Sequence, residues 1–223
     1  VGAYNQFWFD HGAQVSEDRR TSLIVDPPNG RIPPTHPGAK EQVLGDDLPN
    51  DFPVRLLVGG IGIDGPESRG LSERCIVGFN AGPPITPGGY NQNVQIIQTP
   101  DHVVILNEMV HDARIVPTDG RGRLPMDIRR WMGASLGHWE GDTLVVETTN
   151  FTDKKPSYSG SFFSAVGTAD RMHLTERFQQ IGENTLRYEF TVDDPATYTR
   201  PFTGVLLMKR SDQRVYEYAC HEG

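Results

Sequence analysis

Long apolar runs are absent from this 223-residue sequence, and basic residues are few. No stretch approaches the roughly 18 to 20 consecutive apolar residues that a membrane-spanning helix needs. Lysine and arginine number 21 against 29 aspartates and glutamates, for a net charge of −8. Since nucleic-acid binding needs a basic face, we predict neither a membrane span nor a nucleic-acid partner.

Motifs that would fix a reaction are also missing. There is no Gly-x-Ser-x-Gly nucleophile elbow, and the glycines of "VGGIGIDG" lie in an irregular stretch rather than between a strand and a helix. The seven histidines show neither His-x-His nor His-Glu-x-x-His spacing. We therefore predict no metal and no cofactor, and the sequence leaves open whether the protein is an enzyme.

Only two cysteines occur, Cys75 and Cys220. They are either a disulfide in an exported protein or two buried thiols in a cytosolic one. A disulfide that closes so long a loop stabilises by about 4 to 5 kcal/mol in the chain-entropy model, and it persists in oxidising compartments. We favour the disulfide and a periplasmic or secreted location.

The 24 glycines and 17 prolines indicate many short strands and turns. Hairpin-like patterns occupy five segments, residues 22–33, 94–116, 137–151, 172–192 and 204–220. Without crossover helices between them, we predict one all-β domain over residues 1–223, an antiparallel meander that closes into a lipocalin-like barrel or half-barrel. Residues 33–74 are predicted to be a long surface excursion or lid with a helical turn near 39–44, and a short helix is expected after Pro125.

Several motifs together carry a resemblance. The stretches "DGRGRLP", "GHWEGDTLVVETTNF", "ERF", "TVDDPATYTRPF" and "YEYACHEG" resemble a large family of exported bacterial hypothetical proteins over most of residues 22–223. The resemblance implies a signal peptide upstream of Val1 and implies no particular reaction. Separately, "WEGDTLVV" is similar to strands of lipocalin-like barrels, which hold small apolar ligands.

The stretch "ILNEMVHDARIV" sets four titratable or charged residues in an apolar run: Glu108, His111, Asp112 and Arg114. On an uninterrupted strand His111 would face away from the other three, whereas a bulge would bring it beside Glu108 or Arg114. One interpretation is a catalytic acid-base pair oriented by Arg114, with His111 as the proton carrier. The other is an ion pair at a barrel rim. In either case we expect Glu108 or Asp112 to be the counter-charge.

Further polar and aromatic residues are candidates for a ligand pocket. Glu176 and Arg177 are adjacent, so on a strand one faces inward and needs a partner. The aromatic residues could line a pocket or belong to the core. The full set of ligand-binding candidates is Trp139, Glu176, Arg177, Phe178, Tyr188 and Tyr218.

Two functions remain open at this point. The first is an exported β-barrel that binds a small apolar or aromatic molecule, with cofactor-free acid-base chemistry of the lyase, isomerase or dehydratase type. The second is a non-catalytic carrier, or a structural component of the cell surface or extracellular matrix that self-associates through strand edges.

Overall fold

The computed structural model describes residues 17–43, 65, 69–78, 81–161 and 164–218. Within these residues the chain is all-β, and no helix has the length and apolar character needed to cross a membrane. The described residues also form two single 3-10 turns, η3 (Met109–His111) and η4 (Ala169–Arg171). The strands are β1 (Ile24–Asp26), β2 (Glu41–Val43), β3 (Val94–Gln98), β4 (His102–Asn107), β5 (Ala113–Pro117), β6 (Ala134–Glu140), β7 (Thr143–Thr149), β8 (Ser164–Val166), β9 (His173–Gly182), β10 (Thr185–Asp193) and β11 (Phe202–Lys209).

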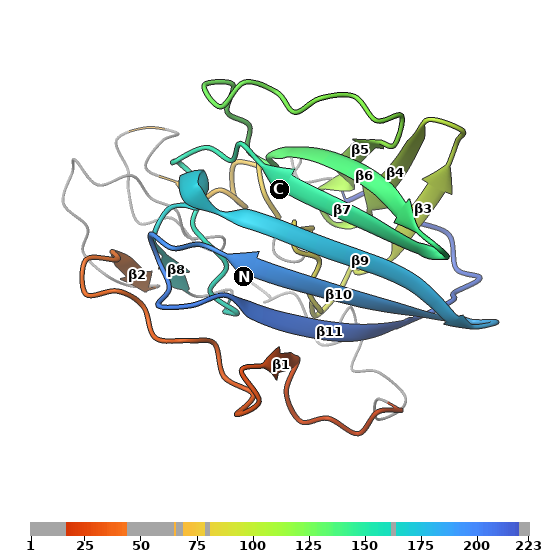
Figure 1. Cartoon of the computed structure of the whole chain (residues 1–223), viewed down its shortest axis with the longest axis horizontal. Helices are drawn as coiled ribbons and strands as arrows, with labels where there is room; N and C mark the ends of the chain where they lie inside the picture. Colours follow the sequence, from red (N-terminus) through yellow and green to blue (C-terminus); the bar gives the residue numbers. More distant parts are fainter. Residues whose placement is uncertain (1–16, 44–64, 66–68, 79–80, 162–163, 219–223) are drawn as a thin grey trace, which may run out of the picture.

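All strand pairs are antiparallel, which confirms the predicted fold class at that level (Figure 1). A six-stranded sheet has the order β1-β11-β10-β9-β7-β6, a three-stranded sheet the order β3-β4-β5, and β2 pairs with β8. Hairpins between consecutive strands form most of these pairs. Gly141 lies at the β6–β7 turn with φ +62°, a conformation that suits glycine.

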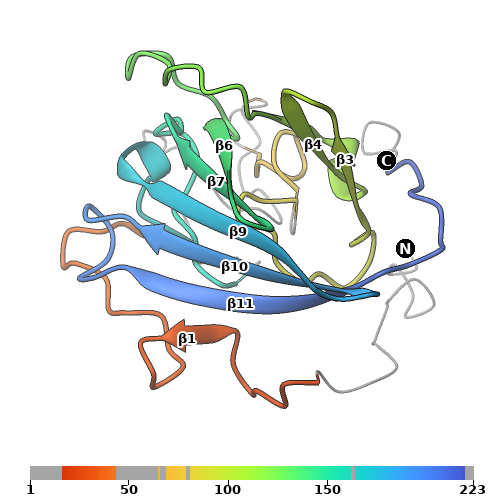
Figure 2. The same ribbon diagram turned by 45° about the vertical axis from the view of Figure 1, so that its right-hand side comes forward.

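The period-two alternation of the strands builds the core. On β10, Tyr188, Phe190 and Val192 are buried, and the inward residues opposite them on β9 include Phe178 and Glu176. Apolar side chains of β4 and β5 belong to the same core as those of the long sheet. Figure 2 shows the three-stranded sheet above the right-hand part of the curved long sheet. The main core therefore lies between the two sheets.

The prediction of a closed barrel is wrong, because no sheet of the described residues closes. Strand β5 lies beside β6, and a Cβ built on Gly137 of β6 would come within 2.9 Å of Val116 Cγ1 of β5. The two strands nevertheless share no ladder of backbone hydrogen bonds. At the other side β1 pairs with β11, so that edge is not available to β3. The two sheets remain separate.

Two of the five predicted hairpins lack their second arm. Ile24–Asp26 pairs with β11 rather than with a strand after the turn at residues 27–30. After β11 ends at Lys209, the described residues 210–218 contain no strand. Strand β11 instead pairs with β1, which is distant in the sequence, and with β10.

The two predictions of helical segments are also wrong: among the described residues, neither segment is helical. Glu41–Val43 is a strand paired with β8, while residues 44–64 and 66–68 of the predicted excursion lie outside the described residues. After Pro125 the chain makes turns, because the Asn150 side-chain amide donates hydrogen bonds to the carbonyl oxygens of Pro125 (2.7 Å) and Ile128 (3.1 Å). These bonds hold the segment against the end of β7.

Candidate functional site

A buried ion pair lies between the two sheets. Arg114 on β5 and Glu176 on β9 both point inward, with 7% and 0% of their surface exposed. The guanidinium donates to both carboxylate oxygens, and the Nη2–Oε1 distance is 2.9 Å. The hydroxyl of Tyr188, on the neighbouring strand β10, donates to Glu176 Oε1 at 2.7 Å. A bidentate pair with an additional donor is the arrangement that offsets the burial of two charges.

The protonation states of this network are fixed by its contacts. Burial alone would lower the pKa of Arg114, but the attraction and hydrogen bonds of Glu176 outweigh it and raise that pKa. Burial, and then the charge of Glu176, raise the pKa of Tyr188 well above its usual value. The backbone N–H of Ile85 donates to the Tyr188 hydroxyl oxygen at 3.0 Å. Arg114 stays charged and Tyr188 stays neutral, so the network is suited to holding the two sheets together.

A second buried cation, Lys155, has no such partner. It follows β7 in a loop and is 6% exposed. Its Nζ donates to the carbonyl oxygen of Pro83 at 3.0 Å and lies 4.8 Å from the centre of the Phe151 ring. Its own carbonyl accepts a hydrogen bond from the Ala169 N–H at 2.9 Å, which fixes the loop. Among the described residues, no carboxylate forms an ion pair with it.

The surroundings of Lys155 favour the neutral amine. The pKa of Lys155 is lowered to about 7: burial is the largest cause, the positive charge of Arg114 adds to it, and the charge of Glu176 partly opposes both. With a pKa of about 7, about half of the molecules would carry a neutral amine at neutral pH. A neutral lysine amine is a base and a nucleophile, unlike the charged ammonium.

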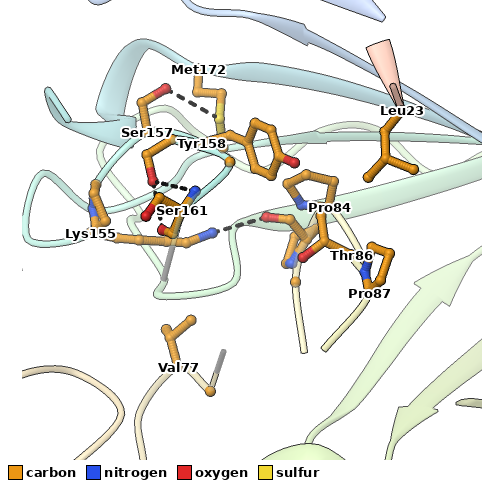
Figure 3. Close-up of a pocket in the computed structure, with 16 residues that line it drawn as sticks. Leu23, Val77, Pro84, Thr86, Pro87, Lys155, Ser157, Tyr158, Ser161 and Met172 are labelled. Atoms are coloured by element: carbon orange, nitrogen blue, oxygen red, sulfur yellow. Dashed lines mark hydrogen bonds between the residues drawn. The ribbon is translucent and has the colours of Figure 1, made fainter. Parts of the chain in front are cut away.

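Lys155 lies in the wall of a pocket of about 280 Å³ (Figure 3). Apolar side chains form much of this pocket, and hydroxyl groups lie among them. Lys155 is the one charged side chain among the described lining residues. The apolar members include Leu23, Val77, Pro83, Pro84, Pro87 and Met172, and the hydroxyl-bearing members are Thr86, Ser157, Tyr158, Ser159 and Ser161. We call this the Lys155 pocket.

The aromatic wall of the Lys155 pocket is Tyr158. Its ring packs edge-on against Phe190, with centroids 5.4 Å apart, and lies 5.9 Å from Phe202. Burial raises the pKa of Tyr158 to about 12. The phenol therefore stays protonated at neutral pH and can donate a hydrogen bond. In Figure 3 its ring lies above the extended Lys155 side chain.

The four catalytic candidates of residues 105–116 do not form one cluster. The chain reverses through η3 between β4 and β5, so neither an uninterrupted strand nor a simple bulge is present. Glu108 is buried and accepts hydrogen bonds from the Asn93 side chain (2.8 Å) and the Tyr216 backbone N–H (3.0 Å). His111 Nδ1 lies 3.1 Å from the carbonyl oxygen of Tyr218. Both residues hold the C-terminal segment in place.

The prediction that Glu108 or Asp112 is the counter-charge of Arg114 is wrong. Neither Glu108 nor Asp112 pairs with it, because Glu176 from the facing sheet does. His111, Asp112 and Arg114 nevertheless all line a second pocket of about 700 Å³, together with Arg121 and other residues of the loop that follows β5. Because the guanidinium of Arg114 is already paired with Glu176, it is not available to a ligand, and we consider this pocket a weaker candidate for a reactive site than the Lys155 pocket.

The six ligand-binding candidates fall on both sides of the sheet. Phe178 and Tyr188 are buried in the core, with ring centroids 4.9 Å apart. Arg177 faces outward and pairs with Glu140, and Trp139 is 46% exposed. Glu176 is the partner of Arg114, and Tyr218 packs near Cys75. None of the six is among the described residues that line the Lys155 pocket.

The predicted disulfide between Cys75 and Cys220 stays a prediction, because Cys220 lies outside the described residues. Cys75 and Tyr218 pack against the same small cluster of Ala81, Met109 and Val110. The chain two positions before Cys220 therefore runs close to Cys75.

Sequence reasoning did not find Lys155. It has the same residue type as its exposed neighbour Lys154, and nothing in "TDKKPS" separates the two. Its amine contacts the carbonyl of Pro83, which is 72 positions away in the sequence, and the ring of Phe151. For metals, no three His, Cys, Asp or Glu side chains of the described segments gather in a way that could hold an ion.

Comparisons with protein-family models, with curated proteins and with solved structures find no match. Two of the sequence motifs have structural roles in the fold. Asn150 of "ETTNF" adopts φ +60° and holds the turns after Pro125. Asp194 of "TVDDPATYTRPF" is buried, and its carbonyl oxygen accepts hydrogen bonds from the N–H groups of Thr197 and Tyr198. The functional proposal therefore depends on the geometry of the pocket.

Proposed function

We propose that this protein binds a small, largely apolar molecule in the Lys155 pocket and that the Lys155 amine is the reactive group of the site. The observation that carries the proposal is a buried lysine, without a carboxylate partner, in the wall of an apolar pocket. Strongly perturbed titratable groups in a pocket are typical of functional sites.

The stability cost of Lys155 supports a functional role. Burying a charged or strongly polar group with few partners disfavours the folded state, and an apolar residue of similar length would avoid that cost. The neighbouring Arg114 shows the alternative, since its charge is fully paired. A residue that is costly to the fold is explained more readily by activity than by stability.

The lining of the pocket indicates the kind of ligand. Its walls are mostly apolar, and the described residues offer no arginine that would bind a carboxylate or phosphate. The volume of about 280 Å³ is at the small end of ligand pockets, which span roughly 300 to 1,000 Å³. The ligand is therefore a small neutral molecule, apolar or aromatic.

The chemistry that suits this group is proton transfer or covalent catalysis by an amine. A base with a pKa near the working pH is the most effective one, and such reactions need no bound cofactor. Lyase, isomerase and dehydratase reactions all fall in this range. The mechanism would use the Lys155 amine, and the hydroxyls of Ser157 and Tyr158 belong to the same pocket lining.

Filling the pocket tests where the ligand binds. Ser161 is exposed at the pocket wall, beside Lys155 in Figure 3, so a bulky residue there would occupy the space without disturbing the core. Ser161→Trp should weaken binding of N-phenyl-1-naphthylamine, a neutral fluorescent apolar probe, by at least about 10-fold, or about 1.4 kcal/mol. Lys154→Trp is the matched control, because Lys154 is exposed and outside the described lining. Unchanged binding in Ser161→Trp would contradict the proposal.

A non-catalytic carrier is the second candidate. The described lining residues include no carboxylate and no imidazole that could work with Lys155 as a second proton carrier. A carrier would bind the same neutral ligands and return them unchanged. Mass spectrometry of ligand recovered after incubation separates the two, since an enzyme would release altered product.

Export to the periplasm or the cell exterior belongs to the same proposal. It is supported by the Cys75 and Cys220 pair and by the resemblance of the motifs to exported bacterial proteins. Under non-reducing conditions, intact protein should take up no alkylating reagent at either cysteine. Two alkylated cysteines in the native protein would contradict the disulfide.

A further inference from the structure

We propose that Lys155 forms a Schiff base with small, neutral, apolar aldehydes or ketones that enter the Lys155 pocket. This inference rests on the proposed function, because it concerns the same pocket and names the class of its ligand. It goes further by assigning Lys155 as a covalent nucleophile.

The contacts of Nζ leave its lone pair available. The Pro83 carbonyl oxygen accepts an N–H of Lys155, and the ring of Phe151 lies on the amine at 4.8 Å. Both contacts engage the hydrogen side of the amine, because an oxygen acceptor and a π face attract N–H groups. No donor in the described part of the chain is bonded to Nζ. In the neutral form the lone pair is free to attack an electrophile in the pocket.

Among the described residues, the Ser157 hydroxyl has only a weak acceptor. Ser157 is 4% exposed, and its Oγ faces the sulfur of Met172 at 3.9 Å, a weak acceptor. A ligand oxygen would be a stronger acceptor for the same O–H. Because Ser157 also lines the Lys155 pocket, its O–H is available to an oxygen atom of a bound ligand.

The step balances without an oxidant or a reductant. The Nζ lone pair forms a bond to the carbonyl carbon while the C=O π pair moves to oxygen, which takes up a proton; nitrogen loses one proton to water, giving a neutral carbinolamine. The hydroxyl then leaves as water after protonation, the nitrogen lone pair forms C=N, and the resulting protonated imine releases its remaining N–H proton to water. The net change is amine plus carbonyl compound giving imine plus one water.

The charge of the pocket selects neutral carbonyl compounds. A carboxylic or phosphorylated ligand would meet no arginine among the described lining residues, and its charge would lose solvation in an apolar site. It would also stabilise the ammonium form of Lys155, which is not nucleophilic. An aromatic aldehyde meets none of these penalties and matches the apolar walls.

Reductive trapping with benzaldehyde and sodium cyanoborohydride at about pH 7 tests the proposal, since reduction converts an imine to a stable benzyl amine. The chain has four lysines, and Lys40, Lys154 and Lys209 are exposed. Peptide fragmentation should locate the benzyl group at Lys155 with at least about 10-fold preference over Lys154. Lys155→Arg should abolish this modification, whereas Lys154→Arg should retain it at wild-type rate, with circular dichroism showing that both variants fold.

Displacement of N-phenyl-1-naphthylamine by benzaldehyde, and by benzyl alcohol as the analogue without a carbonyl, separates the possible failures. Displacement without trapping at Lys155 would overturn the Schiff base and leave the proposed function standing. Equal trapping at all four lysines would also overturn the Schiff base. No displacement by either compound, with no trapping at Lys155, would overturn both.

Discussion

Two cations are buried in the interior of this protein, and their surroundings differ. Arg114 meets Glu176 in a bidentate ion pair that Tyr188 completes. Lys155 meets one backbone carbonyl and an aromatic ring. As a result the pKa of Arg114 is raised, whereas burial lowers the pKa of Lys155 to about 7.

The difference separates a structural cation from a reactive one. Arginine does not lose its proton in proteins, so a buried arginine needs a carboxylate and then acts as a cross-link. Lysine can lose its proton, so it tolerates a site without a counter-charge by becoming neutral. Only Lys155 of the two lines the apolar pocket of about 280 Å³.

The largest effect on stability is expected from removing the buried ion pair of Arg114. Glu176→Ala leaves the guanidinium buried and unpaired, which should lower the free energy of unfolding by about 3 to 5 kcal/mol. Urea denaturation measures it. The control is Glu140→Ala, which removes the outward-facing partner of Arg177 and should lower stability far less, because that ion pair is exposed to solvent. A similar decrease in the free energy of unfolding in the two variants would show that the buried ion pair stabilises the fold no more than an exposed one does.

Replacing Lys155 with an apolar residue should raise the stability of the protein rather than lower it. Lys155→Met removes a group that is costly to bury, so we expect the free energy of unfolding to rise by about 1 to 3 kcal/mol at pH 7. The loss of the hydrogen bond to Pro83 sets the lower end of that range. The comparison is made by urea denaturation against Lys154→Met, which should change stability by no more than about 0.5 kcal/mol.

The advantage of Lys155→Met should depend on pH. The unfolded chain keeps the lysine proton up to about pH 10.4, whereas the folded protein releases it near pH 7. Between these values the unfolded state binds more protons, so wild-type stability rises with pH relative to the variant. The gap should be largest at and below about pH 7 and shrink toward about pH 10. A gap that does not change with pH would contradict a neutral buried amine.

A smaller loss is expected from Tyr188→Phe. The change removes the donor to Glu176 and leaves the Ile85 N–H without its acceptor, which should cost about 1 to 2 kcal/mol in urea denaturation. Tyr158→Phe removes the corresponding hydroxyl on the Lys155 side and should cost less. If Tyr158→Phe were the more harmful of the two, the hydroxyl of Tyr188 would not be part of a stabilising network.

Local structure was the part of this fold that the sequence predicted well. The alternation of residues 186–192 and the turn at Gly141 identify two hairpins, because both depend on neighbouring residues. Barrel closure could not be predicted in the same way. It depends on whether β1 or β3 pairs with β11, and a choice between distant strands leaves no local pattern.

The candidate site was predicted only in part, for a related reason. Arg114 and Glu176 were both recognised as residues in need of partners, but they are 62 positions apart and their pairing depends on how the two sheets pack. Lys155 gave no signal, because its environment depends on Pro83, 72 positions away, and on Ala169 in η4. Residue type fixes what a side chain can do, and long-range packing decides which lysine can do it.

The most direct test of the central claim is the titration of the Lys155 amine itself. Trace labelling of the folded protein with acetic anhydride from about pH 5 to about pH 10, read by peptide fragmentation, reports the neutral fraction of each lysine. Labelling of Lys155, expressed relative to its own plateau, should be half-maximal near pH 7, where burial places its pKa. Labelling that instead keeps rising to about pH 10 in parallel with that of Lys154 would contradict a neutral amine in the pocket.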